Sequence, residues 1–281
     1  MGTLIQLVQS ESERLDQYLS SLPADAWSRP SACELWEVGD VVAHLIFWGE
    51  LYAASIRQAM QGDISPLEDY PLAGSFTSQQ LSEFNHENAL TWRKNLGDRL
   101  LATFRSTNER FNRVLVGLAP QDWNRPAYHP FRVLPVQSRV EAWVAELAFH
   151  GWDIRSELEP VAHLSQESLG VLSHWIGQRA VGYLRLDGFR LHQSLAETVC
   201  YRFDLTDLSS GGYDLLVEDD SCRMEPRGTT SPHVIFSLDA ETFVLLGHRR
   251  LKLESVIKDG RLMIEGDRSL AAAFREWFKR D

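Results

Sequence analysis

Three residues whose side chains are typical metal ligands, His44, Glu146 and His150, lie in apolar segments of the sequence. Glu146 and His150 are four positions apart, so on a helix they share one face, with Cβ atoms about 5–6 Å apart. At that spacing a carboxylate and an imidazole can bind one ion from adjacent turns. Two histidines and one glutamate form a catalytic type of zinc site, which leaves positions for water or substrate. Ferrous iron and nickel suit the same set of ligands.

A repeated motif precedes both segments. Residues 22–30 read LPADAWSRP and residues 118–126 read LAPQDWNRP, with leucine, tryptophan, arginine and proline at identical offsets. Each copy leads into an apolar helix that carries candidate ligands. If the two copies pack about a pseudo-twofold axis, the helices that follow them face each other, and His44 can complete the ligand set of Glu146 and His150.

Each of these signals has a structural alternative. A lone histidine on an apolar helix is more often a core residue than a ligand, and Glu-x-x-x-His is also a common helix-stabilising pair. The conjunction favours the metal site, because three ligand types follow matched repeats in a sequence where an unpaired charge is costly.

Several neighbouring residues have two readings. Asp40, four positions before His44, is either an acceptor that orients this imidazole or a residue that caps and charges the start of the helix. Asp153, three positions after His150, has the same two readings, and the structural one is favoured. Cys33 lies in the loop before the His44 helix and is read as a fourth ligand or a redox-sensitive thiol. Free cysteines are more often small buried hydrophobes.

Cationic residues supply candidates for anion binding. Arg249, flanked by His248 and Arg250, is the better lead, because a thiol cofactor or a dicarboxylate needs cationic partners. A solvated charged turn is the alternative for this segment. Arg29 and Arg125 belong to the repeats, so we expect them to fix the loops that brace the helices rather than to clamp a substrate carboxylate.

The first half of the chain is predicted to be helical, because apolar residues recur with helical spacing. The expected helices cover residues 4–22, 40–62, 78–116 and 136–158. Four helices with one long connection between the second and the third predict a bundle with a site on facing helices. An aromatic stripe is expected to be mostly core, with one edge at the mouth of the pocket: Trp36, Phe47, Trp48 and Trp143.

After Pro160 the pattern changes to strand-like alternation with turn signals. We expect helices over residues 166–183, 240–246 and 270–278, and strands over residues 198–203, 213–217, 222–225, 233–237 and 262–264. This α+β pattern is large enough for a core of its own. The sequence therefore predicts two domains, residues 1–162 and 163–281.

Composition narrows the class of protein. A net charge of −11 and a pI near 5.3 disfavour a general nucleic-acid or anionic-membrane surface. The sequence has no apolar run of about 18 residues that would span a membrane, and its start lacks the features of a secretory signal. Three widely spaced cysteines favour a reducing cytoplasm over a disulfide framework. We expect a cytoplasmic monomer or homodimer that binds small molecules, and neither nucleic acid nor membrane.

Two segments resemble the signatures of the mycothiol-dependent maleylpyruvate isomerase family, in the DinB-like superfamily. They are residues 29–45, RPSACELWEVGDVVAHL, and residues 146–154, ELAFHGWDI. Residues 245–249 (LLGHR) and 264–267 (IEGD) resemble pieces of the family's sterol-carrier-like domain. The resemblance covers the whole chain and implies an α+β protein, with an N-terminal DinB-like four-helix bundle followed by a smaller sterol-carrier-like α+β domain.

By this likeness His44, Glu146 and His150 fall on the family's divalent-metal ligands, usually for zinc, and Arg249 falls loosely on its Gly-Arg position. Family members use the metal to activate a low-molecular-weight thiol for isomerisation or S-transfer. The family commonly has Gly-Trp-Thr where residues 35–37 read Leu-Trp-Glu here, which predicts a reshaped loop near the metal.

The leading prediction is therefore a metal-dependent S-transferase or isomerase that acts on a small electrophile with a thiol such as mycothiol as cosubstrate. A second hypothesis is a hydrolase or amidase that uses metal-bound water as the nucleophile. A third, non-enzymatic hypothesis is a carrier of apolar ligands that retains a relic metal site.

Overall fold

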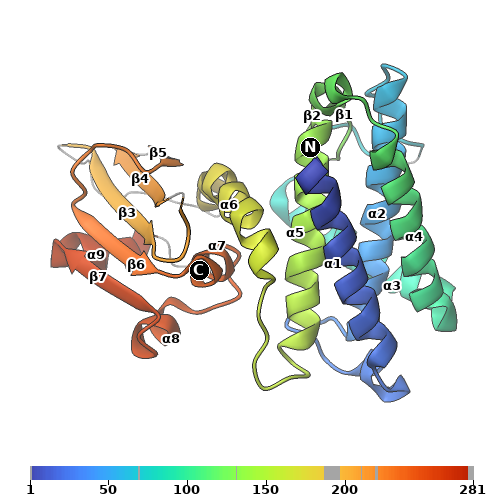
Figure 1. Cartoon of the computed structure of the whole chain (residues 1–281), viewed down its shortest axis with the longest axis horizontal. Coiled ribbons are helices and arrows are strands. Elements are labelled where there is room, and N and C mark those ends of the chain that lie inside the picture. Colours follow the sequence, from blue (N-terminus) through green and yellow to red (C-terminus); the bar gives the residue numbers. More distant parts are fainter. Residues whose placement is uncertain are drawn as a thin grey trace. The chain divides into compact units, whose positions relative to one another are not determined.

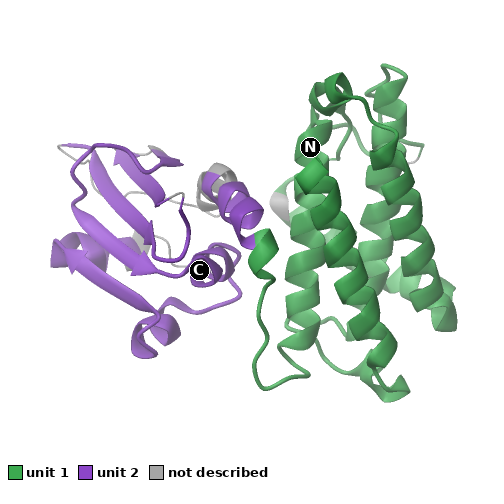
Figure 2. Ribbon diagram, viewed as in Figure 1, with its two compact units in different colours: residues 1–168 green, residues 169–281 purple. Residues whose placement is uncertain are grey.

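The computed structural model describes residues 2–68, 70–130, 132–186, 197–209, 211–218 and 221–277. The chain forms two compact units, Met1–Ser168 and Leu169–Asp281 (Figures 1 and 2). The division falls in the first turn of α6 (Gln166–Leu186). The domain ranges predicted from the sequence, 1–162 and 163–281, stay a prediction.

The first unit is helical (Figure 1). Its α-helices are α1 (Gly2–Ser21), α2 (Val38–Met60), α3 (Ser78–Leu96), α4 (Leu100–Val116) and α5 (Val136–Arg155). Helix α1 packs against α4 and α5, and α2 packs against α3, α4 and α5. Because α2 has neighbours on several sides, it is apolar around most of its circumference and its residues Val38–Gly49 are buried. No helix of the described residues combines the length and the apolar character that a bilayer crossing requires.

The helix predicted over residues 78–116 is wrong in one respect, because the structure divides it. Gly97 ends α3 with a φ of +52°, a backbone conformation that favours glycine. A short 3-10 turn, η2 (Gly97–Arg99), then leads into α4. The apolar periodicity continues across the break, so it did not reveal that the helix axis is interrupted there.

Both copies of the repeated motif form the same local structure. The 3-10 turns η1 (Ala24–Ser28) and η3 (Pro120–Asn124) each precede the Arg-Pro pair. The carbonyl of Arg29 accepts the Val38 N–H at 3.0 Å, and the carbonyl of Arg125 accepts the Val136 N–H at 2.9 Å. An antiparallel bridge closes each loop, Pro30 with Glu37 in the first copy and β1 (Pro126–Ala127) with β2 (Leu134–Pro135) in the second. The repeats therefore set where α2 and α5 begin.

The second unit contains a five-stranded sheet in the order β5-β4-β3-β6-β7 (Figure 1). The strands are β3 (Val199–Leu205), β4 (Gly212–Glu218), β5 (Ser221–Pro226), β6 (Val234–Leu238) and β7 (Leu262–Gly266). Only β3 and β6 run parallel among these pairs. The helices after β6 are α7 (Ala240–Gly247), α8 (Leu253–Lys258) and α9 (Arg268–Trp277). Every strand expected from the sequence overlaps a strand of the sheet, whereas α8 was not expected.

Candidate metal centre

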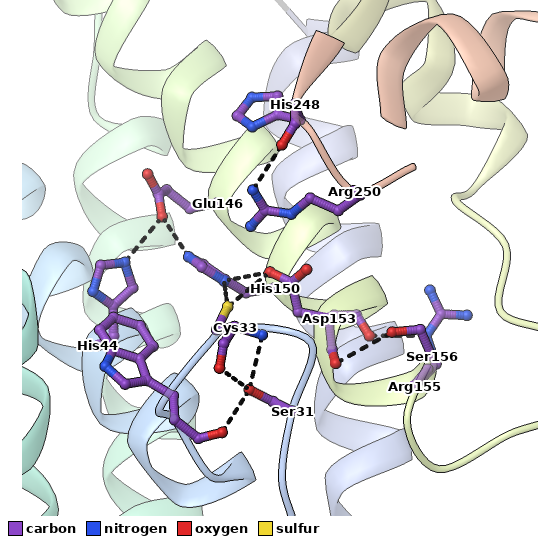
Figure 3. A network of polar contacts seen from close by, with 12 residues as sticks. Ser31, Cys33, His44, Glu146, His150, Asp153, Arg155, Ser156, His248 and Arg250 are labelled. Carbon is purple, nitrogen blue, oxygen red and sulfur yellow. Dashed lines mark hydrogen bonds and ion pairs between the residues drawn. The ribbon is translucent and has the colours of Figure 1, made fainter. Parts of the chain in front are cut away.

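The three candidate ligands converge inside the helical unit. His44 comes from the middle of α2, and Glu146 and His150 come from successive turns of α5 (Figure 3). Oε2 of Glu146 lies 3.3 Å from Nε2 of His44 and 3.3 Å from Nε2 of His150. We call these three donor atoms the inner cluster. The side chains of His44, Glu146 and His150 are 5%, 28% and 12% exposed, so solvent reaches the cluster mainly beside the carboxylate.

The spacing within the inner cluster suits a shared ion. Two ligands bound tetrahedrally at zinc distances of about 2.0–2.1 Å are separated by about 3.3 Å. Both distances from the Glu146 carboxylate to an imidazole nitrogen equal this separation, and they are longer than the usual N–H···O hydrogen bond of about 2.9 Å. Three protein donors also leave a position for a further ligand, as a catalytic zinc site does. The residues present therefore fit a divalent ion.

The surroundings shift the pKa of each of the three groups away from its usual value. Burial lowers the pKa of His44, and the hydrogen bond with Glu146 offsets only part of this effect. Burial also acts to lower the pKa of His150, but interactions with Cys33, Asp153 and Glu146 outweigh it and hold this pKa well above its usual value. Burial acts to raise the pKa of Glu146, but hydrogen bonds with both imidazoles outweigh it and hold this pKa well below its usual value. Glu146 is therefore a carboxylate.

A second group of atoms lies on the other edge of the His150 ring (Figure 3). Nδ1 of His150 is 2.9 Å from Oδ2 of Asp153, which is fully buried. The thiol of Cys33 donates to the same oxygen at 3.1 Å, and its sulfur is 3.6 Å from Nδ1. A metal-ligating histidine usually donates its second N–H to such a carboxylate, which fixes the tautomer and the ring orientation. Asp153 contacts the candidate ligand directly, as the orienting role considered from the sequence requires. Which of its two roles applies stays a prediction.

Cys33 is not placed as a fourth ligand of the inner cluster. Its sulfur faces Nδ1 of His150, whereas the inner cluster uses Nε2 of the same ring. The spacing of Asp153 from His150 was visible in the sequence, but no local pattern indicated that a loop thiol 120 residues earlier meets this carboxylate.

Aromatic side chains pack beside the inner cluster. The ring centroid of Trp36 lies 4.9 Å from that of His44 and 6.3 Å from that of His150. The Trp36 indole N–H donates to Nδ1 of His86, on α3, at 2.9 Å. The ring centroid of Trp48 lies 6.3 Å from that of His44. Of the predicted aromatic stripe, Trp36 and Trp48 therefore lie at the site, and His86 is a neighbour that the sequence analysis did not single out.

Asp40 stabilises the start of α2. Its Oδ2 accepts the Glu37 N–H at 2.9 Å and pairs with Arg93 of α3 at 3.0 Å. Its other oxygen, Oδ1, and Nδ1 of His44 are buried atoms without a hydrogen-bond partner in the described part of the chain. They belong to residues one helical turn apart, so the role of Asp40 in orienting His44 stays a prediction.

Leu35 takes an unusual conformation in the loop that carries Trp36. Its φ is +67°, in the left-handed region that favours glycine, and its side chain is 83% exposed. The chain therefore places leucine in a conformation that suits glycine better, as the reshaped loop predicted from the sequence allows. The Ala32 N–H donates to the Asp153 carbonyl at 2.9 Å and ties the same loop to α5.

Arg249 lies in the second unit, directly after the helix α7. It is exposed, has a φ of +60°, and its backbone N–H donates to the Leu246 carbonyl at 2.9 Å. His248, which precedes it, stacks on Trp175 with ring centroids 4.8 Å apart. The predicted anion contact of Arg249 stays a prediction.

The fold and the inner cluster define a two-unit protein with a candidate metal centre in its helical unit. The family model of the mycothiol maleylpyruvate isomerase N-terminal domain matches residues 8–155, which is more than half of the chain. The chain therefore belongs to the mycothiol maleylpyruvate isomerase family. The model of the SCP-2 sterol transfer family matches residues 192–279. Both the family and the fold class predicted from the sequence are confirmed.

Solved structures agree with this assignment. The crystal structure of the mycothiol-dependent maleylpyruvate isomerase aligns with a TM-score of 0.59 and 14% identity, over 87% of each chain. A histidine-to-alanine mutant of that isomerase aligns with a TM-score of 0.56, at the same identity and coverage. No curated protein matches the sequence. At 14% identity these likenesses concern the fold.

Proposed function

We propose that this protein is a divalent-metal-dependent enzyme that acts on a small electrophilic substrate with a low-molecular-weight thiol as cosubstrate. It either transfers the thiol to that substrate or isomerises the substrate. The observation that carries the proposal is the inner cluster, in which the Glu146 carboxylate lies 3.3 Å from both imidazole nitrogens. Family membership supports the thiol, because the matching model is that of the mycothiol maleylpyruvate isomerase N-terminal domain. Zinc is the proposed ion, since the donor set of two imidazoles and one carboxylate is typical of catalytic zinc.

The chain's own residues would prepare the centre for this chemistry. Nε2 of His44, Oε2 of Glu146 and Nε2 of His150 would hold the ion, and the ion when bound lowers the pKa of a coordinated thiol. Oδ2 of Asp153 accepts a hydrogen bond from Nδ1–H of His150 and so keeps Nε2 directed at the inner cluster. Trp36 covers one side of both imidazoles and limits the access of water there.

Metal analysis tests the centre directly. We expect the wild-type protein to retain about one equivalent of zinc after desalting, as three protein donors predict. His44→Ala, Glu146→Gln and His150→Ala should each lose most of it. His174→Ala is the matched control, because His174 is exposed on α6. Equal zinc content in the ligand variants and the control would overturn the proposal.

A thiol panel tests the chemistry separately. The zinc-loaded protein would be assayed with a generic electrophile and mycothiol, bacillithiol, glutathione or no thiol. We expect turnover to require one of the thiols and to be lost in Glu146→Gln. Turnover without any thiol would instead assign a hydrolase that uses water as nucleophile. Location in the cytoplasm, the monomeric or dimeric state and the lack of nucleic-acid and membrane partners remain predictions.

A further inference from the structure

The side of His150 that faces away from the inner cluster carries a second complete set of metal-ligand atoms. Sγ of Cys33, Nδ1 of His150 and Oδ2 of Asp153 all lie within 4.8 Å of one another. We call these three atoms the outer cluster. Each of the three atoms is in hydrogen-bond contact with the other two, with Sγ···Oδ2 at 3.1 Å, Sγ···Nδ1 at 3.6 Å and Nδ1···Oδ2 at 2.9 Å.

These separations are close to those that one tetrahedral ion would impose. For bonds of about 2.3 Å to sulfur and about 2.0–2.1 Å to nitrogen and oxygen, sulfur lies about 3.5 Å from each other donor, and nitrogen lies about 3.3 Å from oxygen. The sulfur–nitrogen distance already matches, and the other two need an opening of about 0.4 Å relative to those bond lengths. That opening would have to come from the side chains, because the Ala32 N–H···Asp153 carbonyl hydrogen bond ties the Cys33 loop to α5.

The backbone around the outer cluster is held in place. The Ala32 N–H donates to the carbonyl of Asp153 at 2.9 Å, which fastens the Cys33 loop to α5. The Cys33 N–H donates to Oγ of Ser31 at 3.2 Å, which shapes the loop from within (Figure 3). Asp153 is fully buried, whereas Cys33 is half-buried and lies at the solvent side of the cluster. An ion would therefore enter at the thiol.

We propose that Cys33, His150 and Asp153 form a second cation site that takes a thiophilic divalent ion, either Zn²⁺ in excess or the larger Cd²⁺, which would open the three donors further than zinc does. A thiolate donor selects soft ions, whereas the inner cluster offers only nitrogen and oxygen. The incoming ion replaces two protons, one from the thiol and one from Nδ1 of His150, and both leave to solvent. His150 then bridges the two sites through its two ring nitrogens.

Occupation of the outer cluster has a consequence for the inner one. Asp153 orients His150 by accepting a hydrogen bond from its Nδ1–H, and an ion at Nδ1 removes that hydrogen bond. The outer cluster is thus a place where thiophilic ions perturb the candidate metal centre without displacing its ligands. The outer site itself depends only on its own three donors and not on the thiol chemistry proposed above.

Cadmium titration distinguishes the two clusters, because only a sulfur ligand produces an ultraviolet thiolate-to-cadmium charge-transfer band. We expect this band in the metal-free wild-type protein and its loss in Cys33→Ser. His44→Ala, which removes an inner ligand, should keep the band. Cys222→Ser is the matched control, because Cys222 is a buried cysteine of the second unit, and it should also keep the band.

Two results would overturn the outer site: no band in the wild-type protein, or an undiminished band in Cys33→Ser. A second measurement covers the case in which Cys33→Ser does not fold. In the wild-type protein, Cd²⁺ should protect Cys33 from alkylation, as read by peptide mass spectrometry, and unprotected alkylation would refute the site. Failure of the inner centre shows separately, as zinc content that His44→Ala leaves unchanged.

Discussion

The carboxylate of Asp153 should be worth a measurable share of the metal affinity. It is fully buried and accepts from two donors, the His150 ring at 2.9 Å and the Cys33 thiol at 3.1 Å. Asp153→Asn keeps the shape and one acceptor oxygen but removes the charge. Both donors reach the same oxygen, Oδ2, so the amide carbonyl at that position still accepts from both, but as a neutral acceptor.

The size of the effect follows from the hydrogen bond between His150 and Asp153. A hydrogen bond to a charged group contributes about 1.5–3 kcal/mol and a neutral one about 1 kcal/mol. The substitution should therefore cost about 0.5–2 kcal/mol in ligand orientation and basicity. This corresponds to a zinc dissociation constant raised about 2- to 30-fold.

Competition with a chromogenic chelator measures the zinc dissociation constant of the folded variant. Asp16→Asn is the matched control, because Asp16 pairs with Arg105 at 2.6 Å on the surface of α1 and its substitution makes the same change of charge. Circular dichroism establishes that both variants fold. Identical zinc affinity in Asp153→Asn and Asp16→Asn would refute the idea that Asp153 supports the candidate ligand.

Three further predictions follow from single residues. Leu35→Gly should raise the free energy of unfolding, measured by urea denaturation, by about 0.5–1 kcal/mol. Relief of the left-handed backbone strain should exceed the entropy that glycine loses on folding, and a destabilised variant would contradict this. Asp40→Ala should cost about 1 kcal/mol of stability at the helix start and also weaken zinc binding through His44; reduced stability with unchanged affinity would assign Asp40 to the helix start alone. Burial raises the pKa of Cys200 to about 11, so its thiol stays protonated at pH 8. Iodoacetamide should therefore modify half-buried Cys33 first, and equal alkylation rates of the two cysteines in peptide mapping would contradict the burial of Cys200.

Much of the fold could be predicted from the sequence, because helical and strand periods record which faces are buried. Where two helices share one continuous apolar pattern, the period does not show where one helix ends and the next begins. The single helix expected over residues 78–116 is divided at Gly97, whose positive φ leaves no trace in the spacing of apolar residues. The short helix α8 lacks a long enough period to be detected.

The repeats had a sequence signal whose physical meaning came from the structure. Identical residues at identical offsets predicted matched local structures. Their common function, a backbone carbonyl of Arg29 or Arg125 that accepts the first N–H of the next helix, depends on backbone geometry. Side-chain identity alone did not reveal it.

The sequence by itself determined which residue types are available for a metal centre and on which helices they lie, because the spacing of Glu146 and His150 is a local property of one helix. Tertiary structure alone decided which atoms meet. The 3.3 Å approach of His44 to Glu146 joins residues 102 positions apart, and the contact of Cys33 with Asp153 joins residues 120 positions apart. These contacts arise from the packing of α2, α5 and the loop that precedes α2. The duplicated motif predicted that α2 and α5 face each other, whereas the contact of Cys33 with Asp153 had no signal, because packing between a loop and a distant helix leaves no period in the sequence.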